Sequence, residues 1–335
     1  MRPGWFKFPS IAVLVVGGWV VFGSRSGASV PQPAVPGREV LCTYRAQVNH
    51  LPREARTIHV WIPLAKTGQE QRILRRDVHT SIPYTIAQDL DYGNDILHLT
   101  LDSPIPDHVE IAIDYHAQLV GADAASGDRL PTADTLQHDL QPGGLLIIDD
   151  VVRERASRAT TGRSTPLARA RGIYDHVRHT MTYDKRVPGW GRGDTRRACL
   201  LGKGNCTDFH SLFISMARAE RIPARFKIGV VIPQESSGVI PGYHCWAEFY
   251  GQDQGWVPVD ASEAWKHPEL ADYYFGTRDP NRFLISVGRD IQLVPRQQGA
   301  PVNIFFAPYV EIDGQVSSDV GVEVRFSDLQ QGRTT

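Results

Sequence analysis

Cysteine is scarce in this chain, with four residues among 335, at positions 42, 199, 206 and 245. So few cysteines in so long a chain exclude a small fold held together by disulfides. If one of them stays a free thiol, at most one bridge can form among the other three. No CxxC pair occurs, so a tetrahedral Cys/His zinc site is hard to assemble. We therefore predict neither a metal nor a cofactor.

The chain also has no large excess of positive or negative charge. Lys and Arg number 36 against 37 Asp and Glu, which gives a net charge of −1. No basic stripe interleaved with aromatic residues is present, so we expect no nucleic-acid partner. With 41% hydrophobic and 22% charged residues, the composition is that of a globular protein able to bury a core.

The apolar run near the N-terminus, Ile11 to Phe22, is shorter than the roughly 20 residues that span a bilayer. It follows Arg2 and Lys7 and precedes small residues at 24–29, which is the order of parts in a secretory signal peptide. Counted from 8 to 24 the run is longer, so an uncleaved membrane anchor is the alternative. We expect 1–29 to be a signal peptide or N-terminal anchor. The protein is then exported: periplasmic, secreted, or tethered to the membrane.

The remaining chain divides by its periodicity. Residues 30–37 are rich in proline and glycine and indicate a linker. Runs that alternate apolar and polar residues then predict an antiparallel, β-sandwich-like module over 38–120. We expect a connecting segment over 121–165 and a second domain over 166–275. The last part, 276–335, reads as short strands that complete or flank this second domain, with a turn at Asp313-Gly314.

The second domain mixes helices and strands, so the predicted fold class is α+β. One helix starts at Pro166, a residue suited to a first turn, and another runs from Cys206 to about Ala219. Strands are expected at 226–232, 243–250 and 256–260. A glycine-rich loop at 188–194 lacks the spacing and the Lys-Ser/Thr end of a phosphate-binding loop.

Cys206 stands at the start of its helix, where Asn205 is a plausible N-cap. A thiol in a first helical turn feels the positive end of the helix dipole, which lowers its pKa and makes a thiolate available. The alternative reading is a small residue packed in a core, because the rest of its helix face is apolar.

His244 and Asp260 lie on two strands joined by a loop at 251–255. If residue i opposes residue 504 − i, the two residues face each other; a register two residues away leaves them diagonal on the same face. Either register lets the carboxylate reach the imidazole. The alternative is a surface histidine and an aspartate that ends a strand.

Because side chains alternate along a strand, the residues next to His244 divide between the two faces of the sheet. His244, Trp246 and Glu248 point one way, and Cys245 points the other way, toward a core, so Cys245 is a poor candidate for the nucleophile. His210, four residues after Cys206, is either a packed helix histidine or a neighbour of the thiolate. Other candidates for the site are Asn205, His210 and Trp246, which would bind an oxyanion or support the three residues; the family resemblance given next adds Trp190 as a candidate for stabilising the oxyanion.

These segments together resemble the transglutaminase-like superfamily, whose bacterial members carry a Cys–His–Asp triad on a papain-like core. The resemblance covers about 166–275. It rests on GNC at 204–206, FHSLF at 209–213, IPARF at 222–226, GYHCWAEF at 242–249 and GWVPVD at 255–260. Tyr183-Asp184-Lys185 and Trp190-Gly191 also fit exported bacterial members. The extra β-sandwich domains and calcium sites of the animal enzymes are not found.

By this resemblance Cys206 is the nucleophile, His244 the base and Asp260 the carboxylate that orients it. The implied reaction is attack on an amide or peptide bond with a thioester intermediate, which an amine or water then resolves. Expected partners are a protein or peptide substrate and, for a transferase, a primary-amine acceptor. The alternative function is a non-catalytic binding module of the cell envelope that retains a relic triad.

Overall fold

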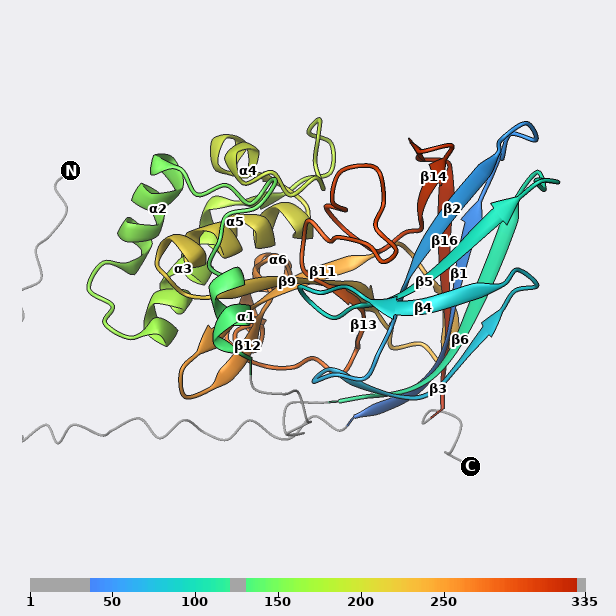
Figure 1. Cartoon of the computed structure of the whole chain (residues 1–335). Helices are drawn as coiled ribbons and strands as arrows, with labels where there is room; N and C mark the ends of the chain where they lie inside the picture. Colours follow the sequence, from blue (N-terminus) through green and yellow to red (C-terminus); the bar gives the residue numbers. More distant parts are fainter. Residues whose placement is uncertain (1–36, 121–130, 330–335) are drawn as a thin grey trace, which may run out of the picture. The chain divides into compact units, whose positions relative to one another are not determined.

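The computed structural model describes residues 37–120 and 131–329 (Figure 1). The predicted signal peptide or anchor at 1–29 and nearly all of the predicted linker at 30–37 lie outside these residues. Within the described part of the chain, no helix is long and apolar enough to cross a membrane.

Strands from 38–119, joined by strands from 237–240 and 309–328, form two antiparallel sheets. In the described ranges each sheet has five strands. One sheet has the order β10 (Ser237–Ile240), β16 (Val320–Asp328), β1 (Arg38–Val48), β6 (Val109–Leu119) and β3 (Gln71–His79). The other has the order β15 (Gln315–Ser317), β14 (Tyr309–Ile312), β2 (Thr57–Leu64), β5 (Asp95–Asp102) and β4 (Tyr84–Gln88).

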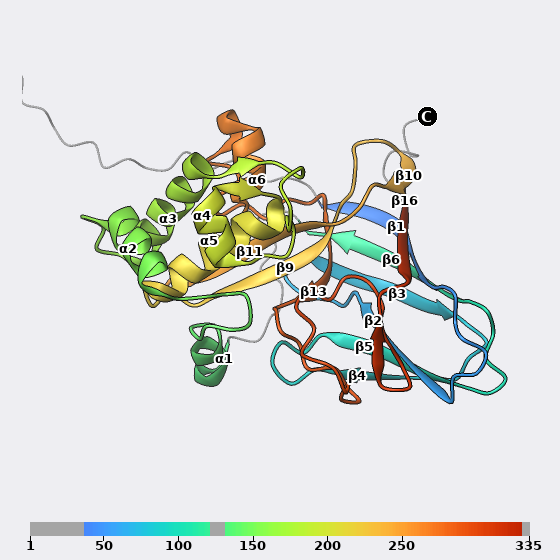
Figure 2. The same cartoon turned by 90° about the horizontal axis from the view of Figure 1, so that it is seen from above.

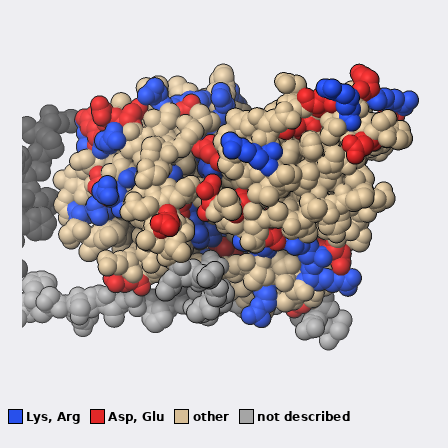
Figure 3. Space-filling model, viewed as in Figure 1, with Lys and Arg blue, Asp and Glu red and all other residues tan. Residues whose placement is uncertain are grey.

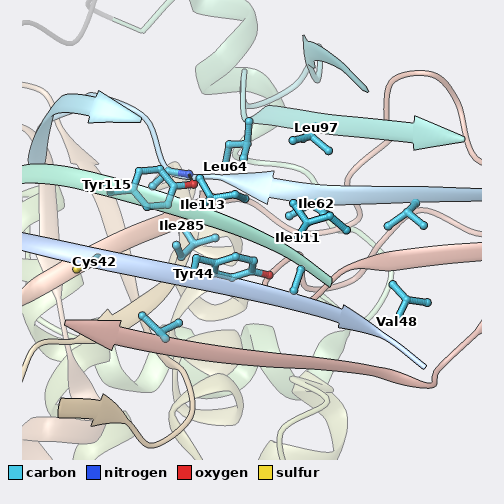
Figure 4. Close-up of a cluster of buried hydrophobic side chains, with 14 of the residues drawn as sticks. Cys42, Tyr44, Val48, Ile62, Leu64, Leu97, Ile111, Ile113, Tyr115 and Ile285 are labelled. Carbon is cyan, nitrogen blue, oxygen red and sulfur yellow. Dashed lines mark hydrogen bonds between the residues drawn. The ribbon is translucent and has the colours of Figure 1, made fainter. Parts of the chain in front are cut away.

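The core of this β module follows from the alternation of its strands. Inward residues of β1 and β6, such as Tyr44 and Ile113, pair directly across the two strands and are buried. Inward residues of β2 and β5, such as Ile62 and Leu97, belong to the same core (Figure 4). The Tyr44 hydroxyl donates to the carbonyl of Phe306 at 2.7 Å, so its polar end is satisfied as well. The predicted antiparallel β module is confirmed.

Three strands of the module, β3, β4 and β10, were not predicted. All three stand at the edges of their sheets and bury few side chains. β3 contains Arg72, Arg75 and Arg76, so the apolar alternation that reveals a strand is absent there.

The last strands of the chain join the β module, which differs from the expectation that 276–335 would complete or flank the second domain. β14 and β15 form a hairpin whose turn, Asp313-Gly314, has φ angles of 48° and 82°. β14 then pairs with β2, and β16 pairs with β1. Only β13 (Arg282–Val287) extends the sheet of the second domain.

The second half consists of helices packed on a four-stranded antiparallel sheet (Figures 1 and 2). The sheet has the order β12 (Gly255–Val259), β11 (His244–Gly251), β9 (Ala224–Val231) and β13. The helices are α1 (Ala133–His138), α2 (Asp150–Thr160), α3 (Pro166–Thr180), α4 (Thr195–Leu201), α5 (Cys206–Ala219), α6 (Ala261–Lys266) and the 3₁₀ turn η1 (Pro268–Leu270). A short parallel pair is formed by β7 (Thr182–Tyr183) and β8 (Lys203–Gly204). The α+β fold class is confirmed.

The helical layer begins earlier than expected. Both α1 and α2 lie within 121–165, which we expected to be a connecting segment. Val152 and Ala156 of α2 are buried in the same cluster as Phe209 and Phe213 of α5, so α2 belongs to this domain. Its polar composition conceals the apolar stripe, because only one face of a surface helix is buried.

A buried ionic cluster joins the β module to the second sheet. The Lys227 ammonium on β9 contacts the carboxylate of Glu70, just before β3, and lies 2.8 Å from Glu248 on β11. Arg225 also binds Glu248, at 2.9 Å. On the face in Figure 3, basic and acidic side chains are interspersed among uncharged ones.

Candidate active site

Helix α5 begins at Cys206 because Asn205 caps it. The side-chain oxygen of Asn205 accepts the backbone N–H of Thr207 at 3.0 Å, and Asp208 accepts the backbone N–H of Asn205 at 3.0 Å. This reciprocal pair is a capping box, which fixes where the helix starts. The Cys206 thiol therefore stands in the first turn, at the positive end of the helix dipole.

The same Asp208 holds the glycine-rich loop beside the helix. Its carboxylate accepts the backbone N–H groups of Gly191 at 2.8 Å and Gly193 at 3.2 Å. Gly193 has a φ of 66°, and a Cβ there would lie 2.5 Å from the Ser211 hydroxyl. The glycines let the loop lie close to the start of α5.

The hairpin of β11 and β12 brings His244 toward Asp260. Ala247 pairs with Val259 and Gly251 with Gly255, so paired residue numbers add up to 506. The direct register, with a sum of 504, is wrong, and the diagonal register is the one present. Three residues, 252–254, form the turn between the glycines, and this turn sets the register.

Asp260 receives hydrogen bonds on both carboxylate oxygens. Its Oδ2 accepts from His244 Nε2 at 2.6 Å and from Arg282 at 2.7 Å. Its Oδ1 accepts from the Ser262 hydroxyl and from the backbone N–H of Glu263, each at 2.9 Å, and so caps α6. Fully buried and held from several sides, this carboxylate fixes the orientation of the imidazole.

Three side chains lie close enough to Cys206 for their charges and that of its sulfur to affect one another: His244, Cys245 and Tyr183. Because His244 uses Nε2 for Asp260, Nδ1 is the nitrogen left for the sulfur. Cys206 is 1% exposed, yet its sulfur has these polar neighbours and is not sealed in hydrocarbon. The structure thus places Cys206, His244 and Asp260 in one site.

The charges of these groups are coupled. The neighbouring Cys245 side chain lowers the pKa of Cys206 well below its ordinary value, against the effect of burial and with further help from His244 and His210. Burial disfavours a charged His244, but the Asp260 carboxylate and the Cys206 sulfur outweigh it and raise the pKa of His244 to about 10. Burial raises the pKa of Asp260, and His244 and Arg282 reverse this and hold it well below its ordinary value. A thiolate–imidazolium pair oriented by a carboxylate follows.

The other predicted residues have different surroundings. His210 is buried behind Asp260: its Nε2 lies 3.4 Å from Oδ1 of Asp260 and 3.2 Å from the backbone nitrogen of Ala261. Trp246 is buried and stacks on the His244 ring at 6.3 Å, with the Arg282 guanidinium 5.1 Å from its ring centre. Both support the His–Asp pair and do not contact the sulfur.

Asn205 and Trp190, the other two candidates, have contacts of a different kind. The amide of Asn205 is used for capping and for a hydrogen bond to the Tyr243 hydroxyl at 3.0 Å. Trp190 is 39% exposed, and the Lys185 ammonium lies 5.6 Å from its ring centre.

Sequence reasoning missed three contributors to the site: Tyr183, Arg282 and Cys245. Tyr183 comes from β7, and its place beside the family motifs was the available signal. Arg282 comes from β13, in the tail, where no motif marks it. Cys245 points toward the core as its parity predicts, but Cys206 lies on that same side. In the part of the chain described here, no group of three or more Cys, His, Asp or Glu side chains is arranged to hold a metal ion.

Comparison with known proteins supports a transglutaminase-like fold for the second domain. The family model described as "Transglutaminase-like superfamily" matches residues 153–261. An uncharacterized protein of Haemophilus influenzae (strain ATCC 51907 / DSM 11121 / KW20 / Rd) is 27% identical over 300 residues, which are 76% of this chain and 81% of the relative. A crystal structure described as a candidate cysteine protease from Cytophaga hutchinsonii has a TM-score of 0.59 at 15% identity, covering 88% of this chain and 92% of that one. A looser match, on which nothing below rests, is the periplasmic domain of TgpA from Pseudomonas aeruginosa, with a TM-score of 0.37 at 17% identity, covering 68% and 90%.

Proposed function

Since residues 153–261 form a transglutaminase-like superfamily core, we propose that this protein is a cysteine enzyme that cleaves or transfers amide bonds through a thioester on Cys206. The observation that carries the proposal is the 2.6 Å hydrogen bond between Asp260 and His244, with His244 close enough to the Cys206 sulfur to lower its pKa. A nucleophile, a base and a group that orients the base are the parts that covalent acyl transfer requires.

The first half-reaction follows from the charges of the pair. The Cys206 thiolate attacks the carbonyl carbon of a carboxamide or peptide, and the C–N bond then breaks. His244, protonated while Asp260 holds it, gives its proton to the departing amine. A thioester between Cys206 and the acyl group remains, and His244 is then neutral and able to act as a base.

Two donors are available for the oxyanion that forms during this attack. The backbone N–H of Cys206 is at the first position of α5, where no intrahelical acceptor exists. The Tyr183 side chain lies near enough to Cys206 for the two groups to perturb each other, so its hydroxyl is a second candidate donor. Because Cys206 is 1% exposed, we infer that substrate entry turns the Tyr183 hydroxyl toward the carbonyl oxygen.

The second half-reaction decides between two enzyme classes. Attack by a primary amine makes the protein a transferase that modifies or cross-links glutamine side chains, and attack by water makes it a peptidase or deamidase. In both, His244 takes the proton of the attacking group. We propose a protein or peptide as the acyl donor and, for the transferase, a primary amine as the acceptor.

We also propose that the reaction takes place outside the cytoplasm. The basic residues Arg2 and Lys7, the apolar run at 11–22 and the small residues after it support export, with the N-terminus cleaved or kept as a membrane tether.

A paired assay tests the function. Purified protein is incubated with a glutamine-containing peptide, with and without a primary amine, and the products are identified by mass. Amine incorporation indicates a transferase, release of ammonia alone a deamidase, and cleavage of the chain a peptidase; each must disappear in Cys206→Ala. Absence of all three over a diverse peptide set would refute the enzyme proposal in favour of a binding module with a relic triad.

A further inference from the structure

Lysine is rare in this chain, and its exposed lysines lie on elements around the start of α5. The sequence contains six lysines, and the structure describes five of them: Lys66, Lys185, Lys203, Lys227 and Lys266. Lys227 is buried in the ionic cluster, and Lys66 is partly buried. In the described ranges the exposed lysines are therefore Lys185, Lys203 and Lys266, which lie just after β7, on β8 and at the end of α6.

The short pair of β7 and β8 places Tyr183 beside the helix that carries the thiol. Tyr183 pairs with Gly204, two residues before Cys206. The backbone N–H of Asp184 donates to the carbonyl of Gly204 at 2.9 Å. The Tyr183 ring also lies 6.1 Å from the ring of Phe209 in the first part of α5. Groups that contact Tyr183 are thus at the end of α5 where the nucleophile stands.

Two ammonium groups contact the Tyr183 ring. The Lys266 ammonium lies 4.4 Å from the ring centre, and the Lys185 ammonium lies 6.0 Å from it. Lys185 also lies 5.6 Å from the ring centre of Trp190. Aromatic faces attract an ammonium at such distances. The two rings therefore hold the charge of Lys185 beside the site and leave it exposed to solvent.

The charge of Lys185 has no acidic counterpart. The carboxylate of Asp184 pairs with Arg186 at 3.0 Å, and that of Glu263 pairs with Lys266 at 2.6 Å. Among the described residues, no carboxylate lies within ion-pairing distance of the Lys185 ammonium; its contacts are the two rings. The positive end of the α5 dipole adds to the same field. An anion that approaches the start of α5 is therefore attracted.

Lys203 differs from Lys185 in the direction of its side chain. In the paired strands Thr182 is opposite Lys203, and Tyr183 is opposite Gly204. Because successive side chains of a strand point to opposite faces, Lys203 points to the face away from Tyr183. It is as exposed a lysine on the same short pair of strands, which makes it a matched control.

We propose that the acyl donor carries a carboxylate close to the reactive amide and that Lys185 binds this carboxylate, so that Lys185 selects acidic peptide segments. The proposal rests on the proposed function of Cys206 and goes further by naming the class of substrate. A lysine ammonium is a point charge with three donors on a flexible stem, so it accepts a carboxylate without one fixed geometry. Its charge affects encounter and binding and takes no part in bond breaking.

The test compares two reagents that form the same bond to the Cys206 sulfur with loss of iodide but differ in charge. Iodoacetate is anionic and iodoacetamide is neutral. Their second-order rates are measured at low salt, and modification of Cys206 is quantified by peptide mapping. The variants are Lys185→Gln, which removes the charge, and Lys185→Glu, which reverses it. The control is Lys203→Gln, and His244 is present in all of these proteins.

The ratio of the iodoacetate rate to the iodoacetamide rate should fall about two- to fivefold in Lys185→Gln, the range of one exposed ion pair. It should fall further in Lys185→Glu. The iodoacetamide rate itself should stay that of wild type, and Lys203→Gln should keep the wild-type ratio. Salt at about 1 M should remove the difference. In the paired assay, a peptide with Glu beside the reactive glutamine should have a higher kcat/KM than one with Gln, and Lys185→Glu should reverse this preference.

A wild-type ratio in both Lys185 variants would overturn the proposal. An equal fall in Lys203→Gln would also overturn it, because the effect would then come from net charge alone. A merely structural role of Lys185 would slow both reagents equally and leave the ratio unchanged. Failure of the proposed function is a different result: iodoacetamide would then modify Cys206 no faster than a cysteine in a free peptide, and His244→Ala would not change that rate.

Discussion

His244 Nε2 lies 2.6 Å from Oδ2 of Asp260, and this contact assigns the opposite ring nitrogen, Nδ1, to the Cys206 sulfur. The imidazole therefore has one orientation, in which Nε2 binds Asp260 and Nδ1 is left for Cys206. Asp260 is able to impose it because Arg282, Ser262 and the start of α6 hold the carboxylate itself. The residues of the site therefore come from distant elements, from Cys206 on α5 to Arg282 on β13.

Replacement of Asp260 by Asn should lower turnover by roughly 10²–10⁴-fold. An amide turned toward Nε2 with its NH₂ group favours the wrong tautomer of His244 and no longer stabilises the imidazolium. Turnover on the peptide found in the paired assay measures the effect. The matched control is Asp253→Asn at the exposed tip of the same hairpin, which should behave like wild type. Equal loss in both variants would show that the hairpin fold, not the carboxylate, is responsible.

Alkylation of Cys206 and turnover should depend differently on pH. The lowered pKa of Cys206 means that its thiolate is present on the alkaline side of that value, so alkylation should become fast at a lower pH than that of a free thiol, which titrates at about 8.5. The pKa of His244, raised to about 10, means that the imidazolium is lost as pH rises through about 10. Turnover should fall there because the leaving amine is no longer protonated, while alkylation continues. A tenfold rise in alkylation rate per pH unit up to about 8.5 would contradict the ion pair.

Tyr183→Phe should lower kcat by about 10²–10³-fold, the usual cost of one oxyanion donor. The phenyl ring keeps the packing against Trp265 and the contact with Lys266, so the fold should be unaffected. Trp190→Phe is the control, because that ring is partly exposed and the contact recorded for it is with Lys185. A loss of kcat in Trp190→Phe with full activity in Tyr183→Phe would reverse this assignment.

Lys227→Met should destabilise the fold by about 3–5 kcal/mol, the usual effect of removing one member of a buried ionic cluster. The carboxylates of Glu70 and Glu248 would then face each other without the ammonium between them. Burial already raises the pKa of Glu70, although Lys227 lowers it. The deficit should therefore shrink as pH falls and Glu70 takes up a proton. Urea denaturation at two pH values measures both effects, with Lys203→Met on the exposed side of β8 as the control. A deficit that grows on acidification would contradict the account.

Much of the catalytic half could be predicted from local signals. The helix that begins at Cys206 follows from a capping residue and an apolar stripe, and the two strands that carry His244 and Asp260 follow from their alternation and the loop between them. The register of that hairpin could not be predicted, because sums of 504 and 506 both keep the two side chains on one face. The turn of 252–254 between Gly251 and Gly255 settles it.

What the sequence does not reveal are contacts between distant segments. Arg282 reaches Asp260 from β13, and β16 returns to pair with β1 across nearly the whole length of the chain. Such partners are chosen by tertiary packing, which no local periodicity records. Cys245 shows the same limit: parity predicts its direction correctly, but only the position of α5 shows that Cys206 lies there.

The most direct test of the central claim is acylation of the protein by p-nitrophenyl acetate, quenched in acid and mapped by peptide mass. Wild type should carry one acetyl group as a thioester on Cys206, and His244→Ala should form it far more slowly at neutral pH. An acetyl group on Cys199 or Cys245 instead, or equal rates in the two proteins, would contradict the assignment of Cys206 as a nucleophile activated by His244.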